Sequence, residues 1–166
     1  MAEWTCTLAG PDNITTGLDS DVKKTYSIET FGCQMNKNDS ELMALSLDKN
    51  GFTAAEEGRV ADITIYNTCS VREHAENRVL SRIRSMRTKL RDGGGIIVVA
   101  GCMAQRMGTE LIENGIADMI IGPYQSPGIG ELLLRHMEDR KSRAFISQDA
   151  RDFSGRINHD LCRVGA

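Results

Sequence analysis

Three of the five cysteines in this 166-residue sequence stand shortly after strand-like runs of β-branched and aromatic residues. These are Cys33 after 26–31, Cys69 after 63–66 and Cys102 after 96–100. They lie 36 and 33 residues apart, and each interval is about the length of one βαβ unit. Because the carboxyl ends of parallel strands share one edge of a sheet, the three thiols could meet at that edge. Thiols gathered in this way bind metals or carry redox chemistry.

A four-iron cluster is the metal group that this ligand set favours. Three thiolates supply one ligand fewer than such a cluster needs, which leaves one iron open to a sulfide, a persulfide or a substrate atom. Gly32 and Gly101 remove side chains where a cluster approaches the backbone, and Asn36 and Asn67 are candidate hydrogen-bond donors near it. A structural zinc site usually has four ligands in short Cys-x₂₋₄-Cys pairs, and the sequence contains no such pair.

The spacing alone predicts a thiol-rich site and not a named cofactor, so other interpretations stay open. A single buried cysteine is usually a small apolar core residue, and three at equivalent strand ends make that interpretation weaker. One alternative is a non-catalytic iron–sulfur or redox-sensing module. Another is a plain α/β interaction domain with buried thiols. Cys6 and Cys162 fall outside the pattern, and we treat them as unrelated to the site.

The elements that would position the cysteines alternate between strands and helices. This alternation predicts a three-layer α/β/α sandwich with a mostly parallel sheet of four to five strands. We expect strands at 26–31, 62–66, 96–100 and 119–121, with a further candidate at 144–146. We expect helices from Asn38 to Asn50, over 71–91, over 110–114, and after a cap at Ser126. The predicted domain is 23–143, between a flexible leader at 1–22 and an irregular tail at 144–166.

Composition limits the environment and the partners. The formal net charge is −3, and no run approaches the ~20 apolar residues that span a bilayer. The amino terminus lacks the features of a signal peptide. We therefore expect a cytoplasmic protein with no membrane contact, and a monomer. In a reducing compartment an odd number of cysteines favours metal or redox chemistry over a disulfide framework.

The helix predicted at 71–91 carries a local excess of positive charge. The only acidic residues in it are Glu73 and Glu76. The basic residues are Arg72, Arg78, Arg82, Arg84, Arg87, Lys89 and Arg91. This is either a solvated face or a surface that contacts nucleic-acid phosphates. For His74, Arg72 and Arg106 we favour ordinary surface roles over ligand roles.

Two methionines, Met35 and Met103, stand beside two of the cysteines. We expect them to be packing residues, because thioether ligation of iron–sulfur clusters is uncommon.

Three stretches around the cysteines resemble a known family. They are Thr30-Phe31-Gly32-Cys33-Gln34-Met35-Asn36 with Asp39-Ser40-Glu41, Asn67-Thr68-Cys69-Ser70-Val71-Arg72, and Ala100-Gly101-Cys102-Met103-Ala104-Gln105-Arg106. They closely resemble the three cysteine motifs in the amino-terminal domain of the tRNA methylthiotransferases, and the resemblance covers roughly 24–137. The Gly-Cys-Gln-Met-Asn form is most similar to the branch that acts on isopentenyladenosine.

The resemblance implies a radical S-adenosylmethionine enzyme that converts N6-isopentenyladenosine in tRNA to 2-methylthio-N6-isopentenyladenosine. In that family one [4Fe-4S] cluster, in a barrel domain, cleaves S-adenosylmethionine. The three amino-terminal cysteines hold an auxiliary [4Fe-4S] cluster whose open iron carries the sulfur or methylthio group. By motif, Cys33, Cys69 and Cys102 would ligate this auxiliary cluster.

The sequence also departs from the family pattern. The barrel motif Cys-x₃-Cys-x₂-Cys does not occur, since Cys162 is the only cysteine after Cys102. We therefore expect the radical barrel and the carboxyl-terminal RNA-binding domain to be absent from this chain. The second cluster and S-adenosylmethionine would belong to the absent barrel. This chain would then contain no catalytic residue and would bind a cluster without turning over.

Overall fold

Six parallel strands form one sheet in the computed structural model, which describes residues 23–69, 73–90 and 94–146. The strands are β1 (Thr25–Phe31), β2 (Thr53–Ala54), β3 (Ile63–Thr68), β4 (Ile96–Gly101), β5 (Met119–Ile121) and β6 (Arg143–Phe145). Their order across the sheet is β2-β1-β3-β4-β5-β6, and every neighbouring pair is parallel. The predicted parallel sheet is therefore confirmed, with more strands than the four to five expected.

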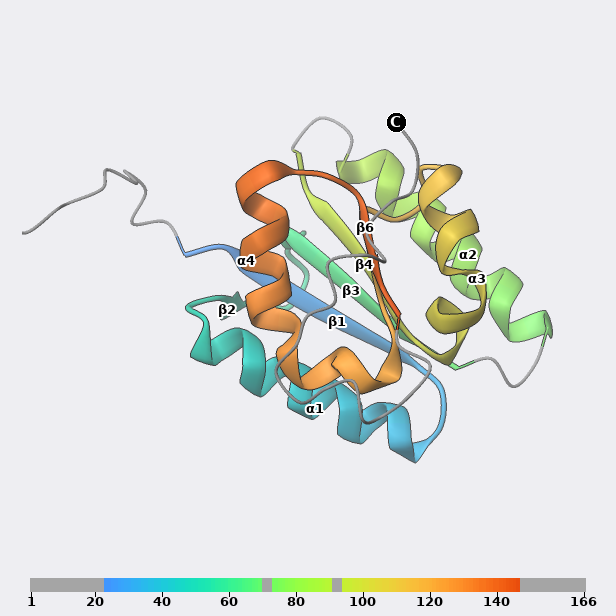
Figure 1. Ribbon diagram of the computed structural model, residues 1–166, viewed down its shortest axis with the longest axis horizontal. Helices are drawn as coiled ribbons and strands as arrows, with labels where there is room; N and C mark the ends of the chain where they lie inside the picture. Colours follow the sequence, from blue (N-terminus) through green and yellow to red (C-terminus); the bar gives the residue numbers. More distant parts are fainter. Residues whose placement is uncertain (1–22, 70–72, 91–93, 147–166) are drawn as a thin grey trace, which may run out of the picture.

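Four α-helices cover the two faces of the sheet (Figure 1). They are α1 (Gln34–Lys49), α2 (Glu73–Leu90), α3 (Cys102–Glu113) and α4 (Ile129–Asp139), with a 3-10 helix η1 (Pro123–Gly128) before α4. Helices α1 and α4 share one face and one apolar cluster, and α2 and α3 share the other. This arrangement is the predicted three-layer α/β/α sandwich. Within the described residues no helix has the length and apolar content needed to cross a membrane.

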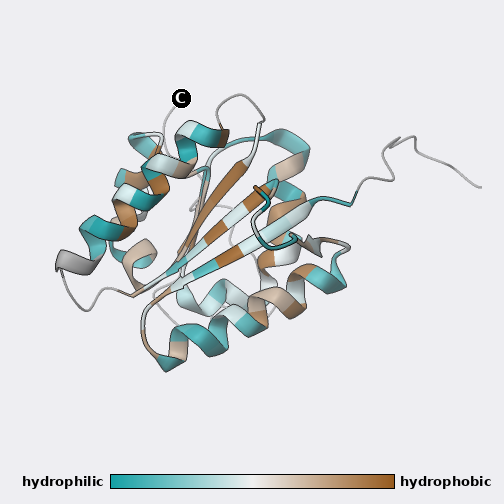
Figure 2. Cartoon of the chain, turned by 180° about the vertical axis from the view of Figure 1, so that it is seen from behind, coloured by the Kyte–Doolittle hydropathy of each residue, from teal (hydrophilic) through white to brown (hydrophobic). Residues whose placement is uncertain are grey.

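Hydrophobic residues lie along the central strands and on parts of the helices (Figure 2). All of β3 is buried, and alternate residues of a strand point to opposite faces. Ile65 accordingly packs in the cluster beneath α1 and α4, and Tyr66 packs in the cluster beneath α2 and α3. The apolar stripe predicted for α2 is confirmed at Val79 and Ile83, which are both buried. Burying each such side chain contributes about 1.5–3 kcal/mol.

Helix α1 differs from its prediction in where it begins and in which face is buried. It begins at Gln34 after an N-cap at Cys33, four residues before the predicted cap at Asn38. Of the three leucines expected to supply its apolar surface, Leu47 is buried, whereas Leu42 and Leu45 are exposed; Met43 is the other buried apolar residue. The four-residue spacing of Met43 and Leu47 places both on the face toward the sheet.

Three other boundaries also differ. Phe52 is buried and leads into β2, which pairs with β1 and was not among the expected strands. Helix α3 begins at Cys102 and not at Glu110, since Gly101 turns the chain directly from β4 into the helix. Ser126 lies within η1, and α4 begins only at Ile129.

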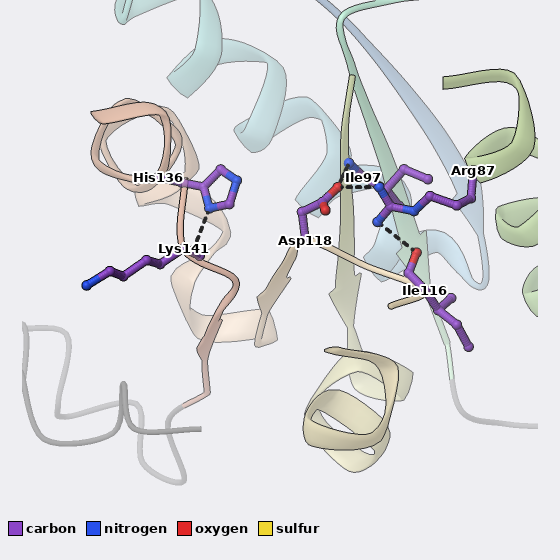
Figure 3. Close-up of polar contacts among 6 residues, drawn as sticks. All are labelled: Arg87, Ile97, Ile116, Asp118, His136 and Lys141. Atoms are coloured by element: carbon purple, nitrogen blue, oxygen red, sulfur yellow. Dashed lines mark hydrogen bonds and ion pairs between the residues drawn. The ribbon is translucent and has the colours of Figure 1, made fainter. Parts of the chain in front are cut away.

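An ion pair joins helix α2 to the start of the central strands, at the edge opposite the cysteines (Figure 3). Asp118 accepts hydrogen bonds from the Ile97 backbone N–H at 2.8 Å and from Arg87 Nη1 at 2.9 Å. Arg87 also donates to the Ile116 carbonyl at 3.3 Å. These bonds join α2 and the segment before β5 to the beginning of β4.

The strand order sets where a ligand would bind. From β1 the chain moves outward to β2 and then crosses to β3 on the other side of β1. In open parallel sheets ligands bind outside the carboxyl ends of the strands, at the point where the order reverses. The carboxyl ends of β1 and β3 therefore form the expected binding position, and β4 is the next strand.

Candidate functional site

Cys33 stands between the end of β1 and the start of α1. As the helix N-cap it has an extended backbone, with φ −88° and ψ −174°. Its backbone N–H donates to Asn36 Oδ1 at 3.3 Å, and its thiol contacts the same oxygen at 3.4 Å. The backbone N–H groups of Asn36 and then Met35 lower the pKa of the Cys33 thiol. Cys33 is exposed, so its sulfur is accessible to solvent. The neighbouring backbone N–H groups also favour the thiolate form.

Cys69 is held beside the loop that carries Cys33. Its backbone N–H donates to the Phe31 carbonyl at 2.9 Å, which extends the pairing of β1 and β3 by one step. The approach is close, because a Cβ atom added to Gly32 would lie 2.9 Å from Cys69 Cβ. Cys69 is half-buried, and its side chain makes a small contribution to the lowered pKa of the Cys33 thiol.

Cys102 is the first residue of α3, directly after β4. The residue is exposed, yet partial burial of the thiol raises its pKa. Negative charge at Cys69, then Asp39, then Cys33 raises that pKa further. Cys102 therefore interacts electrostatically with both other cysteines. The structure brings all three predicted thiols to one edge of the sheet.

Two buried asparagines join the loops that carry the thiols. Asn36 Nδ2 donates to Asn67 Oδ1 at 3.0 Å, and Asn67 Nδ2 donates to the Asn36 carbonyl at 2.7 Å and to Ser40 Oγ at 2.9 Å. The next residue, Thr68, donates its hydroxyl to the Ala100 carbonyl at 2.7 Å. A continuous set of hydrogen bonds thus connects α1, β3 and β4 beneath the cysteines. Donation from Asn36 or Asn67 to a bound group stays a prediction.

Gly32 and Gly101 have no side chain, and this leaves room for neighbouring atoms of the same chain. Gly101 has φ 92°, and a Cβ atom there would lie 2.3 Å from the Thr68 carbonyl oxygen. At Gly32 an added Cβ would lie 2.3 Å from Asn36 Oδ1. Backbone strain at the positive φ of Gly101 and these close approaches exclude larger residues. The glycines let the three loops approach one another, a role that the sequence did not indicate.

Of the two methionines next to the cysteines, one lies in the core and the other lies on the surface. Met103 is fully buried, as predicted, but Met35 is 74% exposed and is not a packing residue. As the second residue of α1 it lies on the side away from the sheet. Asp39, Ser40 and Thr68 contribute to the site and were not identified from the sequence. Their signal in the sequence was their place in the stretches that resemble the family, where we predicted no role for them.

The described side chains do not form a site for a single metal ion. In the part of the chain that the structure describes, no group of three or more His, Cys, Asp or Glu side chains is placed to hold a single ion. A four-iron cluster makes a different demand, because each thiolate binds a different iron. Its ligands therefore stand farther apart than those around one ion.

The positive charge of α2 is partly used within the molecule. Arg82 pairs with Glu29 at 3.1 Å and Arg87 with Asp118 at 2.9 Å. Arg106, on α3, pairs with Glu76. The exposed cations on the described part of α2 that remain for a partner are Arg78, Arg84 and Lys89. Arg72, Arg91 and the side chain of His74 lie outside what the structure describes.

Comparison of the sequence with protein-family models identifies the family of this chain. The family described as "Uncharacterized protein family UPF0004" matches residues 25–122, which contain all three cysteines and the strands before them. The chain belongs to this family. The UPF0004 match ends just after β5, so it covers the cysteine edge and the central strands of the sheet.

Curated relatives agree with the resemblance to the tRNA methylthiotransferases. A protein of Dictyoglomus thermophilum is 41% identical over 75% of this chain and 28% of its own length. One of Thermotoga petrophila is 37% identical over 84% of the chain and 30% of its own length. One of Corynebacterium jeikeium is 33% identical over 83% and 27%. Each is named tRNA-2-methylthio-N(6)-dimethylallyladenosine synthase, and the chain spans less than a third of their length.

Proposed function

We propose that this chain is the part of a tRNA methylthiotransferase that holds an auxiliary [4Fe-4S] cluster through Cys33, Cys69 and Cys102. The observation that carries the proposal is the convergence of three free thiols from the ends of β1, β3 and β4. These strand ends adjoin the reversal in strand order, where parallel sheets bind their ligands. The names of the UPF0004 relatives supply the reaction class.

The residues at this edge suit such a cluster. Cys33 and Cys102 are exposed and Cys69 is half-buried, so a bound group would be reachable from solvent. Backbone N–H groups at the start of α1 point at the Cys33 sulfur, and they would stabilise the thiolate as a ligand. When bound, the cluster would supply one iron with a coordination position free for an exogenous sulfur. The chain's own part is to hold three thiolates on a rigid sheet edge.

The substrate would be N6-isopentenyladenosine in tRNA, which is the dimethylallyladenosine in the relatives' names. A tRNA would contact the exposed cations of α2, and the compartment would be the cytoplasm. Cleavage of S-adenosylmethionine would require a Cys-x₃-Cys-x₂-Cys motif, which does not occur in this sequence. We therefore expect the isolated chain to bind iron and to leave tRNA unmodified.

Iron and sulfide content after anaerobic reconstitution tests the ligand assignment. The wild-type chain should hold about four irons and show visible charge-transfer absorption. A Cys33→Ala, Cys69→Ala, Cys102→Ala triple variant should hold none, although Cys6 and Cys162 remain. The matched control is Cys6→Ala with Cys162→Ala, which should retain the iron. Absence of iron in the wild type, or its retention in the triple variant, would reject the proposal.

A further inference from the structure

Asn36 and Asn67 use all of their side-chain N–H groups within the chain. Asn36 Nδ2 donates to Asn67 Oδ1 at 3.0 Å and to the Thr68 carbonyl at 3.3 Å. Asn67 Nδ2 donates to the Asn36 carbonyl at 2.7 Å and to Ser40 Oγ at 2.9 Å. Because a carboxamide has two N–H groups and no more, neither side chain keeps a donor for a bound group in this arrangement.

The amide oxygens of the pair lie against the backbone beside the cysteines. Asn36 Oδ1 accepts hydrogen bonds from the Cys33 backbone N–H at 3.3 Å and from the Cys33 thiol at 3.4 Å. A Cβ atom on Gly32 would lie 2.3 Å from the same oxygen. Asn67 Oδ1 lies against Gly101 in the same way, since a Cβ atom there would lie 2.8 Å from it. The atom that the pair presents to a cysteine sulfur is therefore an acceptor and not a donor.

These contacts reach all three segments that carry a thiol. Asn36 stands three residues after Cys33, in the first turn of α1. Asn67 lies two residues before Cys69, on β3. Its amide oxygen packs on the glycine that directly precedes Cys102. One pair of buried side chains thus contacts the chain within three residues of each thiol.

From these contacts we propose that Asn36 and Asn67 are positioning residues, which fix the three thiols relative to one another and donate no hydrogen bond to the bound group. This role differs from the one that the sequence predicted, in which the two amides are donors near a cluster. The effect on iron rests on the proposed function. The fixed placement of the thiols needs no metal and can be tested without one.

The bound group that we propose makes a strict demand on placement. In a four-iron cluster each thiolate binds a different iron, so the three sulfurs must stand at set separations. Residues that orient metal ligands typically change metal affinity by about 10- to 100-fold when they are replaced. Loss of either asparagine should therefore weaken iron binding by about that factor while all three thiols remain in the chain.

Iron binding tests the positioning role in the reconstituted chain. Asn36→Ala and Asn67→Ala are titrated with iron and sulfide under anaerobic conditions, and Asn67→Ser is used if Asn67→Ala does not fold. Ile83→Ala is the matched control, because Ile83 is fully buried in the apolar cluster beneath α2 and α3 and its truncation weakens the fold outside the amide pair. Circular dichroism checks that each chain is folded at the temperature used. We expect weaker iron binding in the asparagine variants only.

Cross-linking of the metal-free chain measures the placement of the thiols directly. The reduced chains are treated in the presence of a chelator with bis-methanethiosulfonate reagents of graded length, and the two cysteines outside the site are replaced by alanine in every chain. Digestion and mass spectrometry identify the bridged pairs among Cys33, Cys69 and Cys102. We expect the wild type and Ile83→Ala to favour the same reagent length for each pair. The asparagine variants should react over a broader range of lengths.

The outcomes separate the positioning role from the proposed cluster. Equal loss of iron binding in Ile83→Ala, or a cross-linking pattern that the asparagine variants leave unaltered, would overturn the positioning role. Full iron binding by the asparagine variants with a shifted midpoint potential would also overturn it, because the amides would then be donors to the bound group. If the wild type binds no iron while the cross-linking pattern still depends on the amide pair, the cluster is rejected and the positioning role is kept.

Discussion

At the scale of single residues, the site depends as much on two amides as on three thiols. Asn36 and Asn67 are 4% and 0% exposed, and each both donates to and accepts from the other's residue. Since one lies after β1 and the other at the end of β3, the pair fixes the separation of the loops carrying Cys33 and Cys69. A buried amide left without partners costs more free energy than its hydrogen bond contributes.

Replacing Asn67 tests this dependence. Asn67→Ala removes the donor to the buried Asn36 carbonyl and to the half-buried Ser40 hydroxyl, so we expect a loss of about 1–3 kcal/mol in the free energy of unfolding. Urea denaturation followed by circular dichroism measures it. Asn38→Ala, at an exposed position of α1, should change stability by less than about 0.5 kcal/mol. Equal effects of the two changes would contradict a special role for the buried pair.

At the scale of elements, the sequence identified strands better than it identified the starts of helices. The uninterrupted run 96–100 predicted a buried strand, and the regular spacing of Val79, Ile83 and Leu90 predicted a helix face that packs against a core. Both predictions are confirmed. Helix α1 was placed too late because a cysteine is not a usual N-cap. Its cap works through the interaction of Cys33 with Asn36, and that depends on Asn67 from another strand.

Tertiary contacts also explain the other differences in the fold. Strand β2 has two residues and is stabilised by pairing with β1, so its own residues showed no period to detect. The three cysteines were predictable because strand ends are periodic along a βαβ chain. The hydrogen-bonded layer beneath them was not, because Ser40 and Thr68 reach it from different elements only after folding.

The connection between α4 and β6 should make stability depend on pH. His136 is 4% exposed, and its Nδ1 lies 3.0 Å from the Lys141 carbonyl oxygen (Figure 3). Burial lowers the pKa of His136 below its ordinary 6.5, although the Lys141 carbonyl and the charges of Asp118 and Asp139 oppose this. Arg143 lowers the pKa further. The neutral ring is therefore favoured in the folded state.

The sign of the pH effect follows from that preference. The unfolded chain binds a proton at His136 near pH 6.5, while the folded chain binds it only at lower pH. Stability should therefore be full above that value and fall as the pH drops below it. His136→Gln should reduce this slope, measured by urea denaturation at several pH values between about 5 and 8. An unchanged slope in the variant would assign the pH dependence to other groups.

At the scale of the whole molecule, the chain is acidic overall but carries exposed cations on one helix. The net charge is −3, and the ion pairs of Arg82 and Arg87 remove two arginines from the face of α2 that a partner could meet. Arg78, Arg84 and Lys89 remain exposed. Binding to a nucleic acid would therefore be modest in strength and sensitive to salt.

Binding of tRNA at several salt concentrations tests this face. If α2 binds phosphates, Arg84→Gln with Lys89→Gln should weaken binding and reduce the slope of log affinity against log salt by up to about 0.9 for each phosphate that is no longer neutralised. Arg59→Gln, an exposed change on the connection between β2 and β3, serves as the control and should leave that slope unaltered. A weaker affinity with the same slope would argue against phosphate binding at these positions.

The unequal lengths of the strands have a consequence for aggregation. The outermost strands, β2 and β6, contain two and three residues, whereas the long apolar strands β3 and β4 are paired on both sides. Strand β2 pairs with only Thr25 and Tyr26 of β1, so another polypeptide could extend the sheet along the rest of β1 but not along β3 or β4. The segments most able to form amyloid-like stacks are thus enclosed whenever the domain is folded. Aggregation through β3 and β4 should therefore follow unfolding of the domain.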